Sequence, residues 1–245
     1  ALLPGRGPAL SRPGWRTRTM AAYRSRRPTA VGIDLAGSPR RPTGYSVVRS
    51  RRSISAKVLT DDRAILGAVL EDRPDLVVVD APLSLPAGRS SLEDRGGPHF
   101  RDCDRELRRL GIRFFPLTLG PMRMLTRRGI RLRAELEDLG FRVLEGYPGG
   151  SQDRMGLPRK GAGRALLQRA LVRHGLGGVL AQRPLSHDEL DAVTIAWTGR
   201  LFLAGRGVVI GDPDEGLMLL PELGREVRGV RHGFGASRAA FGAPP

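Results

Sequence analysis

The chain has 245 residues, 41 of them Lys or Arg and 25 Asp or Glu, so its formal net charge is +16. A hydrophobic content of 40% is enough for a sizeable core and argues against disorder throughout. No apolar run approaches the ~18 residues of a membrane span, and the single cysteine excludes an internal disulfide framework and a cysteine-rich zinc site. One cysteine is typical of a reducing compartment, so we expect a cytoplasmic protein. The positive charge, almost all arginine, favours nucleic acid as a partner.

The two ends of the chain have the composition of tails. Residues 1–29 carry several arginines, no acidic residue and little apolar periodicity, which predicts a flexible basic N-terminal tail. Because the chain begins with Ala, we expect Met20 to be the natural start. Residues 222–245 return to Arg, Gly and Ala, and predict a flexible C-terminal tail. One domain is therefore expected over residues 30–221.

The first part of this domain alternates short apolar runs with turn residues. Three strands in a meander are predicted over 30–35, 44–49 and 54–59. Apolar residues at helical spacing predict a helix over 61–71, which Asp61 or Asp62 can cap. The continuous apolar run 76–79 is typical of a strand buried on both faces.

The middle and end of the domain mix an irregular segment with helices. Residues 84–119 are polar and rich in Gly, Pro and Arg, with one helical piece over 102–110, so we expect an insertion over one end of the sheet. A fifth strand is predicted over 141–147, and further helices over 121–139, 161–174 and 186–204. The runs 208–210 and 216–220 predict a closing C-terminal hairpin.

This order of elements predicts an α/β fold. We expect a mixed five-stranded sheet with flanking helices, an insertion after the fourth strand and a C-terminal hairpin. In sheets of this kind, ligands gather at the carboxyl ends of the parallel strands. Candidate functional residues should therefore stand where strands end.

Three acidic residues stand at such places. Asp34, Asp80 and Glu145 end the first, fourth and fifth predicted strands. An acid next to a buried strand is costly to desolvate unless it is paired or binds a cation. Any one of them could pair with an arginine or form a turn, but the repetition at three strand ends favours a shared site.

The predicted helix over 186–204 adds two more acids. Ser186 and Glu189 fit a capping box, and capping alone would also explain Asp188. Asp191 follows Asp188 by three residues, so the two share a helix face, and that face continues as the apolar stripe. We therefore expect both aspartates on the side of the helix that faces the core.

Convergence of Asp34, Asp80, Asp188 and Asp191 would predict a metal site. Carboxylates within ~4 Å of one another repel by several kcal/mol in a cleft, and a divalent cation removes that conflict. Ligands that are all oxygen suit Mg²⁺ or Mn²⁺ rather than zinc. Two such ions would suit in-line phosphoryl displacement, with the basic surface contacting phosphates.

Several motifs also resemble a known family over residues 31–221. They are Gly32-Ile33-Asp34-Leu35-Ala36-Gly37, Val79-Asp80-Ala81-Pro82, Glu145-Gly146-Tyr147-Pro148 and His187-Asp188-Glu189-Leu190-Asp191-Ala192, with Arg101-Asp102-Cys103-Asp104-Arg105 and Glu215-Gly216 as supporting marks. The chain resembles the family of unknown function numbered 429, described as predicted RNase H-like nucleases. Its acid layout is similar to that of RuvC-type Holliday-junction resolvases. The resemblance implies an RNase H-like fold and two-metal hydrolysis of a phosphodiester.

On this interpretation, Asp34 bridges two metal ions, with Asp80 on one side and Asp188 and Asp191 on the other. Glu145 has no direct counterpart in the resolvases and would be a further ligand or orient water. Lys160 and Arg105 are candidate nucleic-acid contacts, Lys160 as a compact ammonium near the scissile phosphate. A solvated cation at a helix start is the other interpretation of Lys160. The sequence leaves DNA, RNA and junction substrates open.

Two other functions fit parts of the sequence. Asp34-Leu35-Ala36-Gly37-Ser38 also looks like the first phosphate loop of actin-like ATPases and sugar kinases, since glycine-rich turns after strands cradle phosphates. Such enzymes need two domains, and only one is predicted here. A non-catalytic nucleic-acid-binding module is the third possibility, although such a module gains nothing from clustered acids.

Overall fold

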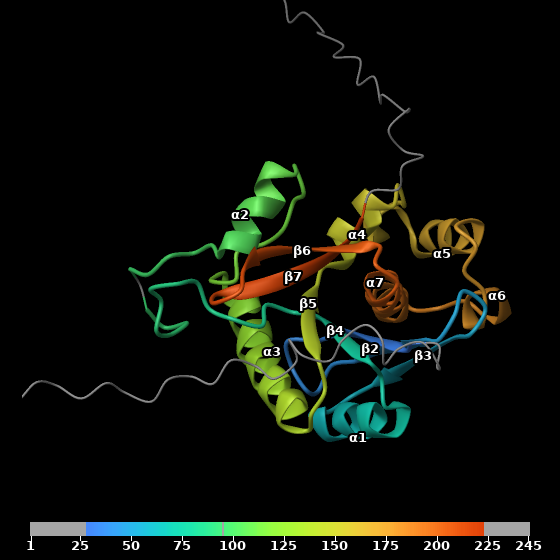
Figure 1. The fold of residues 1–245 in the computed structure, drawn as a ribbon, viewed down its shortest axis with the longest axis horizontal. Coiled ribbons are helices and arrows are strands. Elements are labelled where there is room, and N and C mark those ends of the chain that lie inside the picture. The colour runs from blue at the N-terminus through green and yellow to red at the C-terminus, as the bar shows by residue number, and fades with distance from the viewer. Residues whose placement is uncertain (1–27, 95, 223–245) are drawn as a thin grey trace, which may run out of the picture.

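The computed structural model describes residues 28–94 and 96–222, which form a mixed sheet with helices against both faces (Figure 1). The strand order is β3-β2-β1-β4-β5-β7-β6. Strands β1, β4, β5 and β7 are parallel neighbours, whereas β2, β3 and β6 pair antiparallel. The strands are β1 (Ala30–Asp34), β2 (Thr43–Val48), β3 (Ile54–Leu59), β4 (Leu76–Asp80), β5 (Val143–Gly146), β6 (Gly207–Asp212) and β7 (Gly216–Pro221).

The mixed α/β class is as predicted. The prediction of a five-stranded sheet is wrong, because the described residues form a sheet of seven strands. The predicted hairpin does not stand apart. Its strand β7 pairs in parallel with β5, Met218 opposite Glu145 and Leu219 opposite Gly146. Every residue of β5 is buried, so its second edge requires a partner for its backbone hydrogen-bonding groups.

Helices cover the two faces unequally. On one face lie α1 (Asp62–Asp72) and α3 (Gly120–Asp138), and α2 (Asp102–Arg109) packs beside β6 and β7. On the other face lie α4 (Pro148–Arg154), α5 (Arg164–Arg173), α6 (Val179–Gln182) and α7 (His187–Leu203) (Figure 1). A short 3₁₀ turn, η3 (Lys160–Ala162), precedes α5. Sequence periodicity predicted α1, α2, α3, α5 and α7 but missed α4 and α6, which are short.

Local signals account for the helix starts that were predicted. The Asp61 side chain accepts a hydrogen bond from the Ala64 amide at 2.8 Å, so Asp61 is the cap of α1. Ser186 and Glu189 form the predicted capping box of α7, with the Glu189 amide donating to Ser186 Oγ at 3.1 Å. Gly140, with φ of 85°, ends α3.

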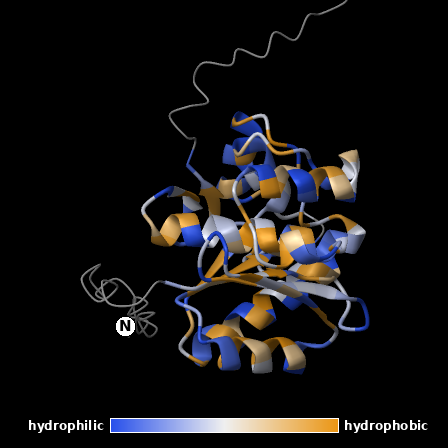
Figure 2. Cartoon of the chain, turned by 90° about the vertical axis from the view of Figure 1, so that its right-hand side faces the viewer, coloured by the Kyte–Doolittle hydropathy of each residue, from blue (hydrophilic) through white to orange (hydrophobic). Residues whose placement is uncertain are grey.

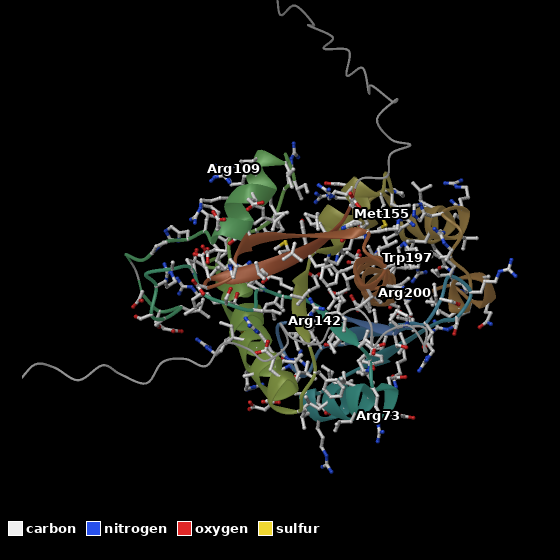
Figure 3. All side chains as sticks on the ribbon, in the orientation of Figure 1. Arg73, Arg109, Arg142, Met155, Trp197 and Arg200 are labelled. Atoms are coloured by element: carbon white, nitrogen blue, oxygen red, sulfur yellow. The ribbon has the colours of Figure 1, made fainter. Side chains whose placement is uncertain are left out.

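Apolar side chains of the sheet alternate between two cores. Val31, Ile33, Val77 and Val79 pack with residues of α1 and α3, while Val78 packs with Ile195 of α7. Figure 2 shows the hydrophobic residues concentrated in the sheet and on the helix faces turned toward it. Trp197 of α7, labelled in Figure 3, belongs to a third apolar cluster that also contains Leu167 and Leu171 of α5.

The insertion after β4 is held by buried polar groups. The Arg89 guanidinium donates to four backbone carbonyls, those of Ser91, Asp94, Gly97 and Pro98. Glu215, in the turn between β6 and β7, accepts hydrogen bonds from the Ala87 amide at 2.6 Å and from the Asp102 amide. This predicted insertion is therefore folded against the end of the hairpin.

The predicted tails lie mostly outside the described residues, at 1–27 and 223–245. Thr29, assigned to the N-terminal tail, belongs to the fold: its amide donates to Asp75 Oδ2 at 2.7 Å and it is buried. None of the described helices combines the length and apolar character needed to cross a membrane.

Helix α7 approaches the sheet most closely at two glycines. A Cβ placed on Gly32 of β1 would overlap the Ala192 carbonyl oxygen and stand 2.6 Å from the Ala196 amide nitrogen. A Cβ on Gly44 of β2 would overlap the Asp188 carbonyl. In each case the obstacle is helix backbone, which a rotamer change cannot relieve. The absence of a side chain at both positions therefore sets the depth of α7 on the sheet.

We predict that Gly32→Ala lowers the free energy of unfolding by about 3 kcal/mol, because the added methyl forces α7 away from β1. Urea denaturation measures the change. The control is Gly67→Ala on the exposed face of α1, where nothing lies within 4 Å of the added Cβ, and which should stabilise by about 0.5–1 kcal/mol. Equal effects of the two substitutions would contradict the close approach.

Candidate active site

Asp34 and Asp80 lie side by side at the carboxyl ends of two parallel strands. They end β1 and β4, and the register sets their Cα atoms directly opposite each other. Both are partly buried. In the alternation of each strand they fall on the same side as Gly32 and Val78, the side that α7 covers. The two predicted strand-end aspartates therefore face the helix that carries Asp188 and Asp191.

Helix α7 brings its two aspartates to this edge of the sheet. Asp191 is 1% exposed, and Asp188 is partly exposed in the first turn. The Asp188 backbone lies against Gly44, so the first turn of α7 sits directly over β2. The neighbouring Glu189 has another role, since it completes the capping box and pairs with Arg183 at 2.5 Å.

Asp34 interacts electrostatically with each of the other three aspartates, and these four residues are the aspartate cluster. The pKa of Asp34 is raised to about 7, first by burial and then by the charges of Asp191 and Asp188, while Lys160 opposes the rise. The pKa of Asp80 is also raised well above its usual range, first by burial and then by the charges of Asp34 and Asp191. Like charges gathered in a partly dry place disfavour ionisation of each member.

Lys160 supplies positive charge to this cluster. Its Nζ lies 2.7 Å from Asp191 Oδ2, although the side chain is 53% exposed. Burial alone would lower the pKa of Lys160, but the charges of Asp191, Asp34 and Asp80 raise it above its usual range. The structure therefore gives Lys160 a defined partner in the cluster instead of leaving it as a solvated cation.

Asp191 has a second partner that the sequence did not indicate. Gln152 Nε2 donates to Asp191 Oδ1 at 2.9 Å, and Gln152 is itself 1% exposed. Gln152 belongs to α4, a short helix that periodicity missed, so no sequence signal marked it. Together Gln152 and Lys160 fix both carboxylate oxygens of Asp191.

Glu145 does not join the four aspartates. In the register it lies opposite Val79, one residue short of Asp80, so its side chain points to the other face of the sheet. There it forms a bidentate pair with the buried Arg101, at 2.5 Å to Nη1 and 2.7 Å to Nη2, and accepts from the Leu83 amide at 2.9 Å. Arg101 also binds Asp104. Glu145 was expected to be a metal ligand or to orient water. In the structure it instead forms an ion pair with Arg101 that fastens the insertion to β5.

Arg105 also lies apart from the aspartates. It is exposed on α2, 3.4 Å from Asp102 Oδ1 and 3.9 Å from Glu215 Oε2, and it donates to the Phe100 carbonyl at 2.8 Å. These contacts belong to the insertion and the hairpin turn.

The donor chemistry of the cluster fits a hard divalent cation. Four carboxylates supply only oxygen ligands, and the raised pKa values of Asp34 and Asp80 reflect burial first and repulsion between the carboxylates second, both of which a bound cation would offset. Within residues 28–94 and 96–222, no three His, Cys, Asp or Glu side chains are already disposed to hold a metal ion. Asp191 is instead held by Lys160 and Gln152. A cation at Asp191 would share this carboxylate with the Lys160 ammonium or displace it.

Comparison with known proteins gives a family and two distant structures. A family model described as "Protein of unknown function (DUF429)" matches residues 32–216. The chain is similar to Thermus thermophilus RuvC in complex with a Holliday junction substrate at 16% identity and a TM-score of 0.42, covering 73% of this chain and 96% of that chain. A second Thermus thermophilus RuvC structure is similar at 15% identity and a TM-score of 0.38, covering 72% of this chain and 96% of that chain. Similarity at this level assigns neither a reaction nor a substrate. No curated protein matches the chain.

The raised pKa of Asp34 predicts a pH-dependent stability in the absence of metal. Between pH about 4 and about 7 the folded chain keeps a proton that the unfolded chain has lost, so stability falls as pH rises through that window. We expect Asp34→Asn to be more stable than the wild type by about 2 kcal/mol at pH 8, with no difference near pH 4. Urea denaturation in EDTA measures both curves.

The control for this comparison is Asp138→Asn, at the exposed end of α3, which should follow the wild-type curve at every pH. Parallel curves for the wild type and Asp34→Asn would show that Asp34 ionises freely in the folded state.

The Arg101–Glu145 pair predicts that Glu145→Gln acts on stability and leaves metal binding unchanged. Removing one partner leaves buried positive charge poorly compensated, so we expect a loss of about 3 kcal/mol. Mn²⁺ affinity, measured by titration calorimetry, should stay at the wild-type value in Glu145→Gln and fall in Asp80→Asn. The opposite result, weak Mn²⁺ binding at unchanged stability, would return Glu145 to the metal site.

Proposed function

The chain belongs to the family described as "Protein of unknown function (DUF429)", and we propose that it is a metal-dependent nuclease that hydrolyses phosphodiester bonds of nucleic acid. The observation that supports this best is the cluster of Asp34, Asp80, Asp188 and Asp191 at the carboxyl edge of a parallel strand pair. Ligands gather at this edge in α/β sheets. The fold class is consistent with the RNase H-like arrangement that the motifs imply.

The four aspartates would hold Mg²⁺ or Mn²⁺, with two ions expected from the number of carboxylates. When bound, such ions lower the pKa of an attacking water and stabilise the charge that develops on the phosphate. The chain's own contribution is to hold the ligands in place. Asp34 and Asp80 are fixed by the strand register, and Asp188 and Asp191 by the capped first turn of α7.

Lys160 would serve the substrate. A compact ammonium beside Asp191 is in reach of the cluster, and its exposed position allows contact with a phosphate that approaches from solvent. The excess of positive charge on the chain would add contacts to the sugar-phosphate backbone away from the cluster. Arg105 is one candidate for such a contact, because it is exposed on α2.

The backbone after β1 disfavours the phosphate loop of actin-like ATPases and sugar kinases. The Ala36 amide donates to Thr43 Oγ1 at 3.2 Å, and the Ala36 carbonyl accepts from the buried Arg128. The Arg41 amide is bonded to the Ser38 carbonyl at 3.0 Å. An amide that is already bonded does not cradle a phosphate. Within the candidate loop this applies to the Ala36 amide, and we retain the nuclease proposal.

The proposal predicts Mn²⁺- or Mg²⁺-dependent cleavage that depends on the aspartate cluster. We expect Asp34→Asn and Asp191→Asn each to lower the cleavage rate by about 10³-fold or more, because each removes charge that binds the metal. The measurement is cleavage of labelled single-stranded, duplex and junction substrates of DNA and RNA, with and without Mn²⁺. Circular dichroism checks that both variants fold.

Asp138→Asn is the matched control and should cleave at the wild-type rate. Equal activity in the wild type and Asp34→Asn would point to a contaminating nuclease and overturn the proposal. Salt-sensitive binding without cleavage of any substrate would instead support the non-catalytic nucleic-acid-binding module.

A further inference from the structure

A pocket of about 630 Å³ lies between the insertion after β4 and the end of β5. Four aromatic side chains line it, those of Phe100, Phe114, Phe115 and Tyr147. This is a large share of the aromatic content of a chain with 7 Phe, 3 Tyr and 2 Trp. The volume is within the range of pockets that enclose small organic ligands.

Much of the pocket wall is fixed before any ligand arrives. Phe100 and Phe114 meet edge to face, with ring centroids 6.0 Å apart. The Tyr147 hydroxyl donates to the Arg113 carbonyl, and the Arg159 guanidinium lies 5.8 Å from the Tyr147 ring centroid. A wall built from such contacts loses little conformational freedom when a ligand binds.

Phe115 differs from these three rings because its side chain is 73% exposed. It is the most exposed large hydrophobic residue of the chain that the structure describes. Its ring therefore offers most of its surface at the mouth of a pocket whose other rings already pack against the protein. Such a ring is suited to stack on a flat, apolar group from outside the protein.

The charged residues of the pocket are all positive. Arg108, Arg113 and Arg159 line it, and no acidic side chain does. Arg108 lies 5.1 Å from the Phe100 ring centroid, and Arg159 is bonded to Asp153 at 2.5 Å, which leaves Arg108 and Arg113 as the less compensated charges. A ligand that combines a flat ring with negative charge matches this lining.

Two residues of the pocket connect it with the aspartate cluster, one through a charge effect and one through the chain. Tyr147 directly follows β5, and the charge of Asp80 contributes to raising its pKa after burial, the largest cause. Arg159 precedes Lys160, whose ammonium contacts Asp191. A polymeric ligand is therefore suited to reach from the pocket toward the aspartates.

We propose that this pocket holds an unstacked nucleobase of a single strand, stacked on Phe115, with its phosphates against Arg108 and Arg113. The inference deepens the proposed function by naming the substrate feature that the site selects. A base inside a regular duplex is stacked on both sides and cannot enter, so the pocket favours single-stranded or extrahelical nucleotides.

Binding in EDTA tests the pocket independently of cleavage. The full chain is titrated against a labelled oligothymidylate of about ten nucleotides and against an abasic oligomer of the same length and charge, by fluorescence anisotropy. We expect Phe115→Ala to weaken binding of oligothymidylate about tenfold and to leave binding of the abasic oligomer unchanged, because only the former has bases to stack. Phe115→Trp, which keeps an aromatic face, should retain wild-type affinity.

Two matched controls lie outside the pocket. Leu110→Ala removes an exposed apolar side chain of the same segment, and Arg109→Ala removes a charge from the outer end of α2 (Figure 3). Leu110→Ala should bind both probes as the wild type does, and Arg108→Ala should weaken both probes more than Arg109→Ala.

An equal effect of Phe115→Ala on the two probes, or none on either, would overturn the pocket proposal. Cleavage that depends on the aspartates could still stand in that case. Conversely, if bases stack on Phe115 but the protein cleaves no substrate, the pocket proposal is supported and the nuclease proposal is overturned.

Discussion

The close contact between α7 and the first two strands is the constraint on which the rest of the site depends. Gly32 and Gly44 leave no side chain between strand and helix, so the helix backbone lies directly on the sheet. At that depth the charges of Asp188 and Asp191 act on Asp34, and the charge of Asp191 acts on Asp80. A side chain at either glycine would overlap the helix backbone and push α7, with its two aspartates, away from the strand ends.

The structure treats its buried carboxylates in two different ways. Glu145 and Asp104 receive a permanent partner in Arg101, whose planar guanidinium binds both and remains charged at any accessible pH. The aspartate cluster has instead a single exposed lysine, which compensates only part of its charge. The pairing with Arg101 compensates the charges of Glu145 and Asp104 and fastens the insertion to β5. In the aspartate cluster, the pKa values of Asp34 and Asp80 stay raised, and a hard cation would stabilise their ionised forms.

The insertion after β4 carries both the Arg101 ion pairs and much of the aromatic pocket. Arg101 and Glu215 tie it to β5 and to the turn of the hairpin, and its far part supplies three of the four pocket rings, those of Phe100, Phe114 and Phe115. The seventh and sixth strands are needed for this, because Glu215 stands in the turn that joins them. Without the hairpin, the insertion would keep its attachment to β5 through Arg101 but lose the hydrogen bonds that Glu215 accepts from the Ala87 and Asp102 amides. The added hairpin therefore contributes to the site although it carries none of the four aspartates.

The sequence by itself determined the elements whose signals are local: the meander, the buried fourth strand, the capped helices α1 and α7, and the position of Asp34 and Asp80 at strand ends. Period and capping act between residues a few positions apart, so they can be read along the chain. Only the tertiary structure decided the pairing of β7 with β5, the opposite face of Glu145, and the meeting of Gln152 and Lys160 at Asp191. These depend on register between distant segments, where a shift of one residue turns a side chain to the other face of the sheet.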